Sequence, residues 1–231
     1  MKKGKKYLAV LQQYDKQRQY TLDEALDLMP KLSTTKFDGS IEVHVRLNLT
    51  EAEMKQPVKN TLSFPNPFGK EKKVLVFADE EEVNIAKKAG ADFVGLDDMI
   101  KKIQGGWLDF DVAIATPKAM PKIAILGKTL GTKGLMPNPK SGTVTTEIEN
   151  AVKEFKAGKI AFKSDNQGIV HIAIGKVSLD AKKVKENFLI AHKRIVEASK
   201  KSPITAIRAI SLNPTMGPGV KLNLDELTAG K

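Results

Sequence analysis

Apolar and polar residues alternate strictly along SIEVHVRLNL, the stretch of residues 40–49. The apolar positions run from Ile41 to Leu49 in steps of two, and the polar positions run from Ser40 to Asn48 between them. Successive side chains of a β-strand point to opposite faces of its sheet, so one face here is apolar and the other polar. The pattern predicts an antiparallel strand that is buried on one face and open to solvent on the other.

The two ends of the chain mix helical and strand patterns. A capping box, Thr21 with Glu24, predicts the start of a helix over residues 21–32. Further along, the patterns predict two strands in 159–175 joined through Asp165–Gly168, a long amphipathic helix in 179–201, and two strands around a Pro/Gly turn in 204–224. Neither end has enough elements for its own core, so we expect both to form one α+β domain.

The middle of the chain alternates strand and helix instead. Short apolar runs predict strands in residues 72–79, 92–96 and 110–117. Helical spacing, closed by glycines, is found in residues 80–91, 97–106 and 146–158. Alternation of this kind is typical of parallel strands joined by helical crossovers. We therefore expect an open-sheet, Rossmann-like α/β domain.

These patterns together predict an α/β protein of two domains. The outer domain is expected to be a split, two-layer α+β domain made of residues 1–66 and 157–231. Residues 67–156 are expected to form the Rossmann-like domain inserted into it. The chain of 231 residues is long enough for two domains of ordinary size.

Positive charge is distributed unevenly between the two expected domains. The chain carries 38 Lys and Arg against 27 Asp and Glu, a net charge of +11. Residues 1–66 and 157–231 together carry 24 basic and 14 acidic residues, whereas residues 67–156 carry 14 and 13. Nearly all of the excess therefore lies on the outer domain, which indicates a polyanionic partner there.

Composition excludes several other classes of protein. The chain has no cysteine, which excludes disulfides and thiolate metal sites and fits a cytoplasmic protein. It has no apolar run of membrane-spanning length, and its first residues lack a signal-peptide core, so no membrane partner is expected. The three histidines, His44, His171 and His192, do not have the spacing of a metal pair. We expect no catalytic residue, no metal site and no cofactor.

Two segments bear on nucleotide binding, and both argue against it. The acidic run Asp79–Glu82 follows the first middle strand, where a dinucleotide site needs glycines. Gly127-Lys128-Thr129 matches the end of a phosphate-binding loop, but Lys122 stands where the first glycine belongs. The stretch from Gly127 to Lys140 is instead expected to be a lysine-bearing surface loop turned by its glycines and made rigid by its prolines.

Two short loops at the ends of expected strands of the outer domain are candidates for binding RNA. Lys36 and Phe37 precede the strand whose polar face starts with Ser40 and Glu42. Thr215, Met216 and Gly217 form a tight turn, in which glycine permits a positive φ or a close approach of another backbone. The alternatives are a core role for Phe37 and a plain hairpin turn at residues 215–217. Aromatic residues make up only 6% of the chain, so recognition is expected to rely on the RNA backbone and shape.

Four strings of residues resemble the ribosomal protein L-one family of the large subunit. They are Thr35-Lys36-Phe37, GLMPNPKSGTV from Gly134, KAGKIAFKSDNQGIVH from Lys156 and TMGPGV from Thr215. The resemblance covers nearly the whole chain. It implies a two-domain protein of the mobile ribosomal stalk beside the tRNA exit site, monomeric off the ribosome. Its implied partners are large-subunit rRNA, exit-site tRNA and, as a repressor of translation, the mRNA of its own operon.

The resemblance also implies which residues contact RNA. Lys36, Phe37, Ser40 and Glu42 match the first RNA-contact segment of the family, and Thr215, Met216 and Gly217 match the second. Lys163 and His171 match a basic position and a histidine in the family's paired strands. The chain departs from the family at Pro214, at Gly131–Gly134, at Lys59-Asn60 and at Asn66-Pro67, where Pro67 is expected to stiffen the connection between the domains.

Two other readings use the same features. A basic adaptor for an acidic protein or a membrane surface would use the same net charge, but its binding would not depend on RNA secondary structure. A nucleotide-binding enzyme built on the middle domain is disfavoured by the acids at Asp79–Glu82.

Overall fold

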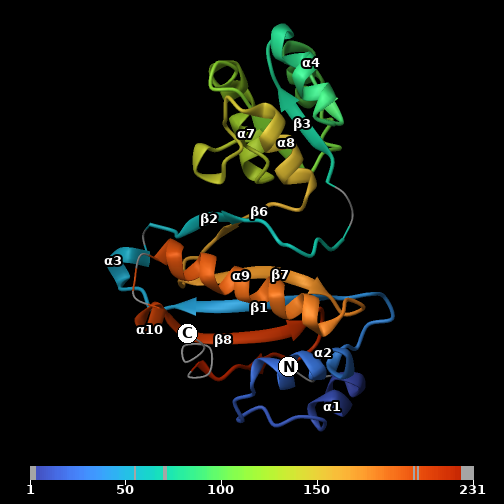
Figure 1. Cartoon of the computed structure of the whole chain (residues 1–231), viewed down its shortest axis with the longest axis vertical. Helices are drawn as coiled ribbons and strands as arrows, with labels where there is room; N and C mark the ends of the chain where they lie inside the picture. The colour runs from blue at the N-terminus through green and yellow to red at the C-terminus, as the bar shows by residue number, and fades with distance from the viewer. Residues whose placement is uncertain (1–3, 55, 70–71, 200, 202, 225–231) are drawn as a thin grey trace. The chain divides into compact units, whose positions relative to one another are not determined.

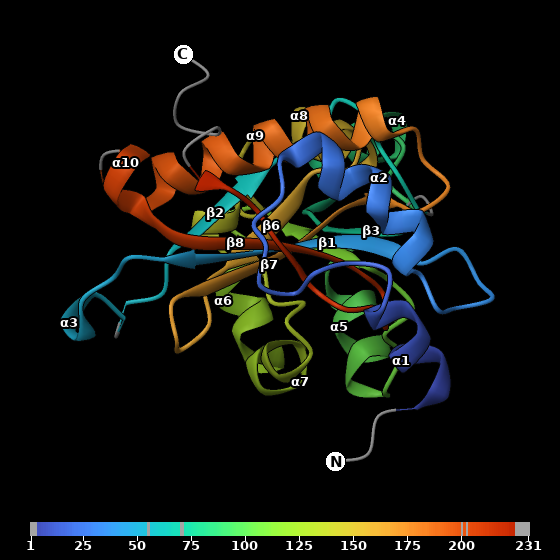
Figure 2. The same cartoon turned by 90° about the horizontal axis from the view of Figure 1, so that it is seen from below.

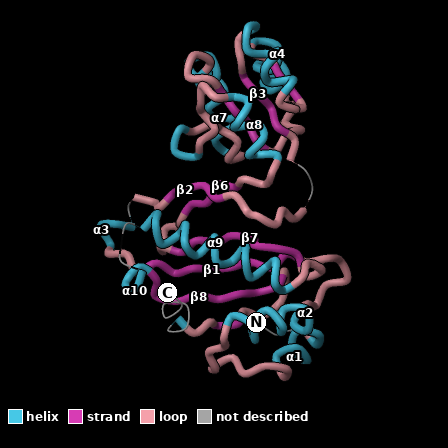
Figure 3. Tube along the Cα trace, viewed as in Figure 1, coloured by secondary structure: helices cyan, strands magenta, loops and turns pink. Residues whose placement is uncertain are grey.

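The computed structural model of the chain describes residues 4–54, 56–69, 72–199, 201 and 203–224. Helices and strands occur along the whole described chain (Figure 3), which confirms the α/β class. The chain forms two compact units. Met1–Gly69 and Phe162–Lys231 make up the first unit, the outer domain, and Lys70–Ala161 make up the second, the inserted domain.

The outer domain is built on an antiparallel four-stranded sheet. Its strands lie in the order β7 (Ile169–Lys176), β1 (Ser40–Leu47), β8 (Ile207–Pro214) and β9 (Val220–Lys221). The central strand β1 pairs with β7 on one side and with β8 on the other. The predicted alternation in β1 is confirmed, because Ile41, Val43, Val45 and Leu47 are all buried.

Two long helices cover the apolar face of this sheet (Figures 1 and 2). They are α2 (Leu22–Leu32) and α9 (Ala181–Ser199), and each contributes a stripe of buried apolar side chains. The polar side chains of β1 lie on the other face of the sheet, which we call the open face. We define the open face by the outward residues of β1, the residues opposite them on β7 and β8, and the β9 residue opposite Ser211: Ser40, Glu42, His44, Arg46, Ile169, His171, Ala173, Lys176, Ala209, Ser211, Asn213 and Lys221.

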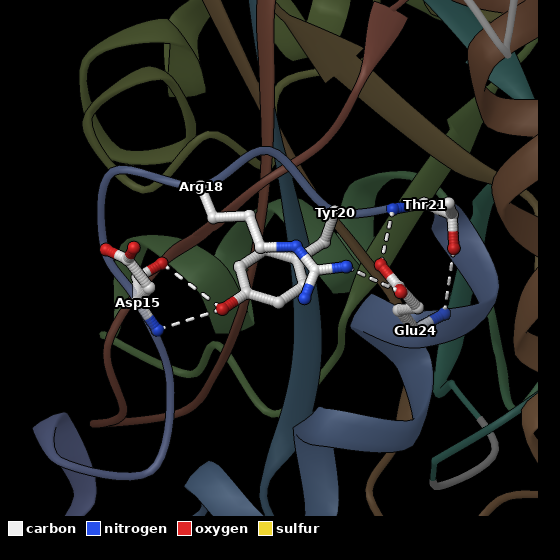
Figure 4. Close-up of polar contacts among 5 residues, drawn as sticks. All are labelled: Asp15, Arg18, Tyr20, Thr21 and Glu24. Carbon is white, nitrogen blue, oxygen red and sulfur yellow. Dashed lines mark hydrogen bonds and ion pairs between the residues drawn. The ribbon is translucent and has the colours of Figure 1, made fainter.

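The segment between α1 (Lys5–Leu11) and α2 is held by a compact set of polar contacts (Figure 4). The predicted capping box is confirmed: Thr21 Oγ1 accepts from the Glu24 N–H, and Glu24 Oε2 accepts from the Thr21 N–H. The Tyr20 hydroxyl accepts from the Asp15 N–H at 2.9 Å. Arg18 lies over the Tyr20 ring and bonds Glu24 Oε1 at 2.8 Å, so the segment has one fixed path.

Several short elements complete the outer domain. They are α3 (Glu51–Met54), α10 (Pro203–Ala206) and β2 (Lys59–Leu62), which pairs with β6 (Ile160–Lys163). The strand expected to begin near residue 204 was wrong at its start, because Pro203 opens a helical turn and Pro is favoured at the first helical position. The strands β6 and β7 are joined through Asp165–Gly168 as expected, but they belong to different sheets.

A buried asparagine fixes the chain near the end of the first outer segment. Asn187 of α9 is fully buried and bonds both backbone groups of Asn66. Its side-chain oxygen accepts from the Asn66 N–H at 3.3 Å, and its amide donates to the Asn66 carbonyl at 2.9 Å. The amide also donates to the Ile174 carbonyl, so the side chain ties Asn66 to both α9 and β7.

The inserted domain is a three-stranded parallel sheet with helices on both faces. Its strands lie in the order β4 (Phe93–Val94), β3 (Val74–Phe77) and β5 (Val112–Ala115). Side chains of β3 alternate between two cores, with Leu75 and Phe77 in one and Val74 and Val76 in the other. The first core is closed by α5 (Asp97–Gln104), α6 (Met120–Ile123), η1 (Ala124–Leu126) and α7 (Gly127–Thr132), and the second by α4 (Glu80–Lys88) and α8 (Ile148–Lys156).

The expected surface loop from Gly127 to Lys140 was wrong in its first half. Gly127–Thr132 form the helix α7, which continues the helical run of α6 and η1. The cause is the spacing of the apolar residues: Ile123, Leu126 and Leu130 are all buried in the first core of the inserted domain. The predicted turn is present only at Gly134, where φ is +71°, and the short helix η2 (Pro139–Ser141) follows.

Candidate nucleic-acid interface

The two candidate loops of the outer domain are bonded to each other. The Ser40 N–H donates to Thr215 Oγ1 at 2.9 Å, and that hydroxyl donates to the Ser40 carbonyl at 3.1 Å. The Thr215 N–H also donates to the Ser40 carbonyl. Residues 175 positions apart in the sequence are thus held together, and residues 35–40 and 215–217 form one continuous surface at the end of the sheet where β1 begins and β8 ends.

The turn that presents Met216 has an unusual backbone. The Gly217 N–H donates to the Pro214 carbonyl at 2.8 Å, which closes a turn over residues 214–217. The residue with positive φ is Met216, at +62°, a conformation that non-glycine residues rarely adopt. At Gly217 the second reason expected for a glycine applies, which is the close approach of another part of the chain. A Cβ at this position would lie 2.8 Å from the Leu32 carbonyl oxygen and 2.5 Å from Pro214 Cγ.

Two large apolar side chains are exposed on these loops. Phe37 is 63% exposed and Met216 is 75% exposed. The alternative of a core role for Phe37 is therefore wrong. Exposed apolar side chains cost free energy in water unless a partner covers them, and a pair on joined loops is typical of a binding surface. The Thr34 hydroxyl donates to the Met216 carbonyl at 3.4 Å, which links the two loops at this point as well.

The loop that carries Lys36 and Phe37 is anchored on its far side by Asp38. The carboxylate of Asp38 accepts from the Ser178 hydroxyl at 2.7 Å and from the Ser178 N–H at 3.1 Å. Lys176 Nζ donates to the Asp38 carbonyl at 3.2 Å. Because Asp38 is held, the exposed side chains of Lys36 and Phe37 point from a fixed loop.

The open face of the sheet carries a cross-strand pair of histidines. His44 of β1 lies opposite His171 of β7, with 2.6 Å between the two Nδ1 atoms, so one ring donates to the other. His44 Nε2 lies 4.0 Å from Glu42, and His171 Nε2 lies 3.5 Å from Asp165. Burial lowers the pKa of His44, and the neighbouring His171 ring lowers it further. His171 is itself about half exposed, so it is open to a partner on this face.

Lys163 is the one candidate that the structure places on another sheet. It ends β6, which pairs with β2, and its side chain is exposed. The remaining candidates lie either on the two joined loops or on the open face. The structure therefore brings together Lys36, Phe37, Ser40, Glu42, His171, Thr215, Met216 and Gly217.

Other binding chemistry finds little support in the part of the chain that the structure describes. No three His, Asp or Glu side chains there are placed to hold a metal ion. No described helix has the length and apolarity needed to cross a membrane. The segment Gly127-Lys128-Thr129 belongs to a continuous helical run and does not follow a strand, as a phosphate-binding loop must.

Sequence reasoning missed the basic residues at the other end of the open face. Arg46 continues the polar side of β1, and Arg208 and Lys221 lie on β8 and β9. The alternation along residues 40–49 was the available signal for Arg46, since it places Arg46 on the same face as Glu42. The sequence alone could not place Arg208 and Lys221 near Arg46, because that placement depends on the pairing of β8 with β1 and β9.

Comparison with known proteins identifies the family. Residues 29–218 match the Ribosomal protein L1p/L10e family. The chain is 48% identical over 226 residues to the large ribosomal subunit protein uL1 of Kosmotoga olearia, and the match covers 96% of both chains. Members of this family are structural components of the cytoplasmic ribosome and not enzymes. With the family match spanning both loops of the interface, the chain belongs to the Ribosomal protein L1p/L10e family, as a protein of the large ribosomal subunit.

Proposed function

We propose that the outer domain binds large-subunit rRNA through the joined loops 35–40 and 215–217 and the adjoining open face. The domain is, in this proposal, a two-layer α+β domain interrupted by a Rossmann-like domain. The observation that carries the proposal is the exposed pair Phe37 and Met216, held on loops that are bonded together beside a polar sheet face. Apolar contacts of this kind suit the sugar edges and bases of RNA, while exposed lysines suit its phosphates.

The family resemblance extends the proposal to the role of the bound protein. The chain, monomeric off the ribosome, would hold the mobile stalk beside the tRNA exit site and assist release of deacylated tRNA. The same surface would bind the mRNA of its own operon and repress its translation. One RNA-binding surface serves both RNAs only if they share a local shape, so the two are expected to compete for the protein.

The test compares two equally exposed apolar residues. Met216→Asp places a carboxylate against RNA phosphates and suits a residue with positive φ, since Asp tolerates that conformation. Ile125→Asp is the control, because Ile125 is 73% exposed and lies in the inserted domain. In filter binding to large-subunit rRNA, Met216→Asp is expected to weaken affinity on the order of tenfold or more through like-charge repulsion.

Ile125→Asp is expected to bind like the parent chain. Equal affinity of the Met216→Asp variant and the parent would move the interface away from this turn. A competition assay with labelled rRNA tests the alternative of an adaptor for acidic proteins. That alternative would be favoured if polyglutamate displaced the labelled rRNA as well as unlabelled rRNA does.

A further inference from the structure

A groove of about 540 Å³ lies at the end of the open face farther from the two loops. Its walls come from segments far apart in the chain: α1, the segment before α2, β1, β7, β8 and β9. Polar contacts of Asp15, Arg18 and Tyr20 hold the segment before α2 (Figure 4). Lys16 and Gln19 of the same segment line the groove. The volume falls in the range of small-ligand sites, which holds a nucleotide or two and not a double helix.

The groove has a basic rim. Lys16, Arg46, Arg208 and Lys221 line it, and no Asp or Glu is found among its described lining residues. None of the four makes an ion pair or a side-chain hydrogen bond with any residue that the structure describes, although eleven ion pairs occur elsewhere among those residues. Four unpaired cations around one hollow repel each other, so the arrangement favours an anion between them.

The floor of the groove differs from its rim. Ile169 and Ala209 of the open face contribute apolar side chains, and Tyr7 of α1 adds an aromatic ring, whereas the neighbouring Ile210 and Leu222 are buried in the core. An apolar and aromatic floor below a cationic rim suits unstacked bases that are joined by phosphates. A free small anion would leave the floor uncovered.

The groove also continues the interface already described. His44 is one of its lining residues, and His44 bonds His171 of the candidate interface. Ser40 and Arg46 lie on the same side of β1, about 20 Å apart at roughly 3.3 Å per residue. A strand of RNA that leaves the joined loops along β1 therefore reaches the basic rim after a few nucleotides.

We propose that this groove binds a short single-stranded stretch of the same RNA that the joined loops bind. The proposal rests on the proposed function, since it places the groove at the far end of that RNA-binding face. Bases lie on Ile169, Ala209 and the ring of Tyr7, and phosphates contact Arg46, Arg208, Lys16 and Lys221.

The test removes two cations from the rim and two from the opposite side of the domain. The rim variant is Arg46→Gln with Arg208→Gln; both side chains are exposed and unpaired, so folding should be little affected. The control is Lys182→Gln with Lys193→Gln, which removes the same charge from exposed positions of α9. The probes are large-subunit rRNA and a fluorescent decauridylate, in filter binding and fluorescence anisotropy.

Counterion release sets the size of the effect. With about 0.7–0.9 ions released per phosphate contact, each contact at 0.1 M salt is worth about 5- to 8-fold in affinity. The rim variant should thus bind rRNA on the order of thirtyfold more weakly than the parent. The slope of log K against log salt should fall by about 1.5. The parent and Met216→Asp should both bind decauridylate, and the rim variant should lose that binding.

The outcomes separate the groove from the main interface. A rim variant that matches the control toward both probes would overturn the groove proposal, as would a parent chain that fails to bind decauridylate. A parent chain that binds rRNA no better than random RNA, or a Met216→Asp variant with full rRNA affinity, would overturn the proposed function instead.

Discussion

Replacing Gly217 by Ala tests whether the turn that presents Met216 depends on close backbone approach. An added Cβ would lie 2.5 Å from Pro214 Cγ and 2.8 Å from the Leu32 carbonyl oxygen. The proline ring can pucker away, but the Leu32 carbonyl belongs to the last residue of α2 and moves only with the helix end. Overpacking of this kind costs about 1–3 kcal/mol. With m near 2 kcal/mol/M, the urea midpoint of the outer domain should fall by about 0.5–1.5 M.

Gly219→Ala is the matched control, two residues further along the same connection between β8 and β9. A Cβ at Gly219 meets nothing within 4 Å, so its midpoint should be unchanged or slightly higher. Far-UV circular dichroism follows both domains, whereas tryptophan fluorescence reports only the inserted domain, because Trp107 is the single tryptophan. The fluorescence transition should be the same in both variants. Equal dichroism midpoints for Gly217→Ala and Gly219→Ala would show that the turn does not depend on the close approach.

Two further predictions concern pH and the division into domains. Burial lowers the pKa of His192, so the unfolded chain takes up the proton first; stability is full above about pH 6.5 and falls as pH drops below it. The free energy of unfolding in urea should therefore decrease less between pH 7.5 and 5.5 for His192→Gln than for the parent, and an equal decrease would contradict a partly buried, neutral imidazole at this position. Replacing Lys70–Ala161 by a short Gly/Ser linker should leave the outer domain folded with most of its rRNA affinity, because its sheet and both covering helices lie outside that range. The isolated Lys70–Ala161 fragment should fold and bind rRNA weakly, and tight binding by this fragment would place the primary site on its lysines.

Local patterns predicted the elements whose causes are local. The period of two along residues 40–49 is sufficient for β1, because each buried side chain in it is flanked by polar ones. The capping box at Thr21 and Glu24 likewise needs only its own four residues. Helix α7 was missed because its two glycines suggest a loop, while the burial of Leu126 and Leu130, which decides the matter, is a tertiary effect.

The candidate site likewise has parts that short stretches of sequence predict and parts that depend on how the strands pair. Phe37 and Met216 could be named from short strings, but the bond between Ser40 and Thr215 that joins their loops needs the register of β1 with β8. The spacing of the histidines along the chain argued only against a metal pair and gave no sign that two of them meet, whereas the register of β1 with β7 sets His44 opposite His171. The basic groove is the extreme case, since four cations from four separate segments meet only when the whole sheet is assembled.

The open face follows from how the outer domain closes its core. Both long helices pack on the apolar side of the sheet, and the polar side chains of β1 leave the other side stable in water without a second layer. The outward side chains of a sheet stand at fixed spacing on a hydrogen-bonded backbone, which suits an RNA surface recognised by shape. Two roles therefore fall to the polar residues of β1, which are Ser40, Glu42, His44 and Arg46. Their polarity determines which face of the strand is buried, and their side chains line the proposed path of the RNA.

A substitution of Glu42 or His44 by a large apolar residue would disturb both roles, so a loss of RNA affinity in such a variant would have two causes at once. For that reason the decisive variants are those at Met216, Arg46 and Arg208, whose exposed side chains take no part in the core.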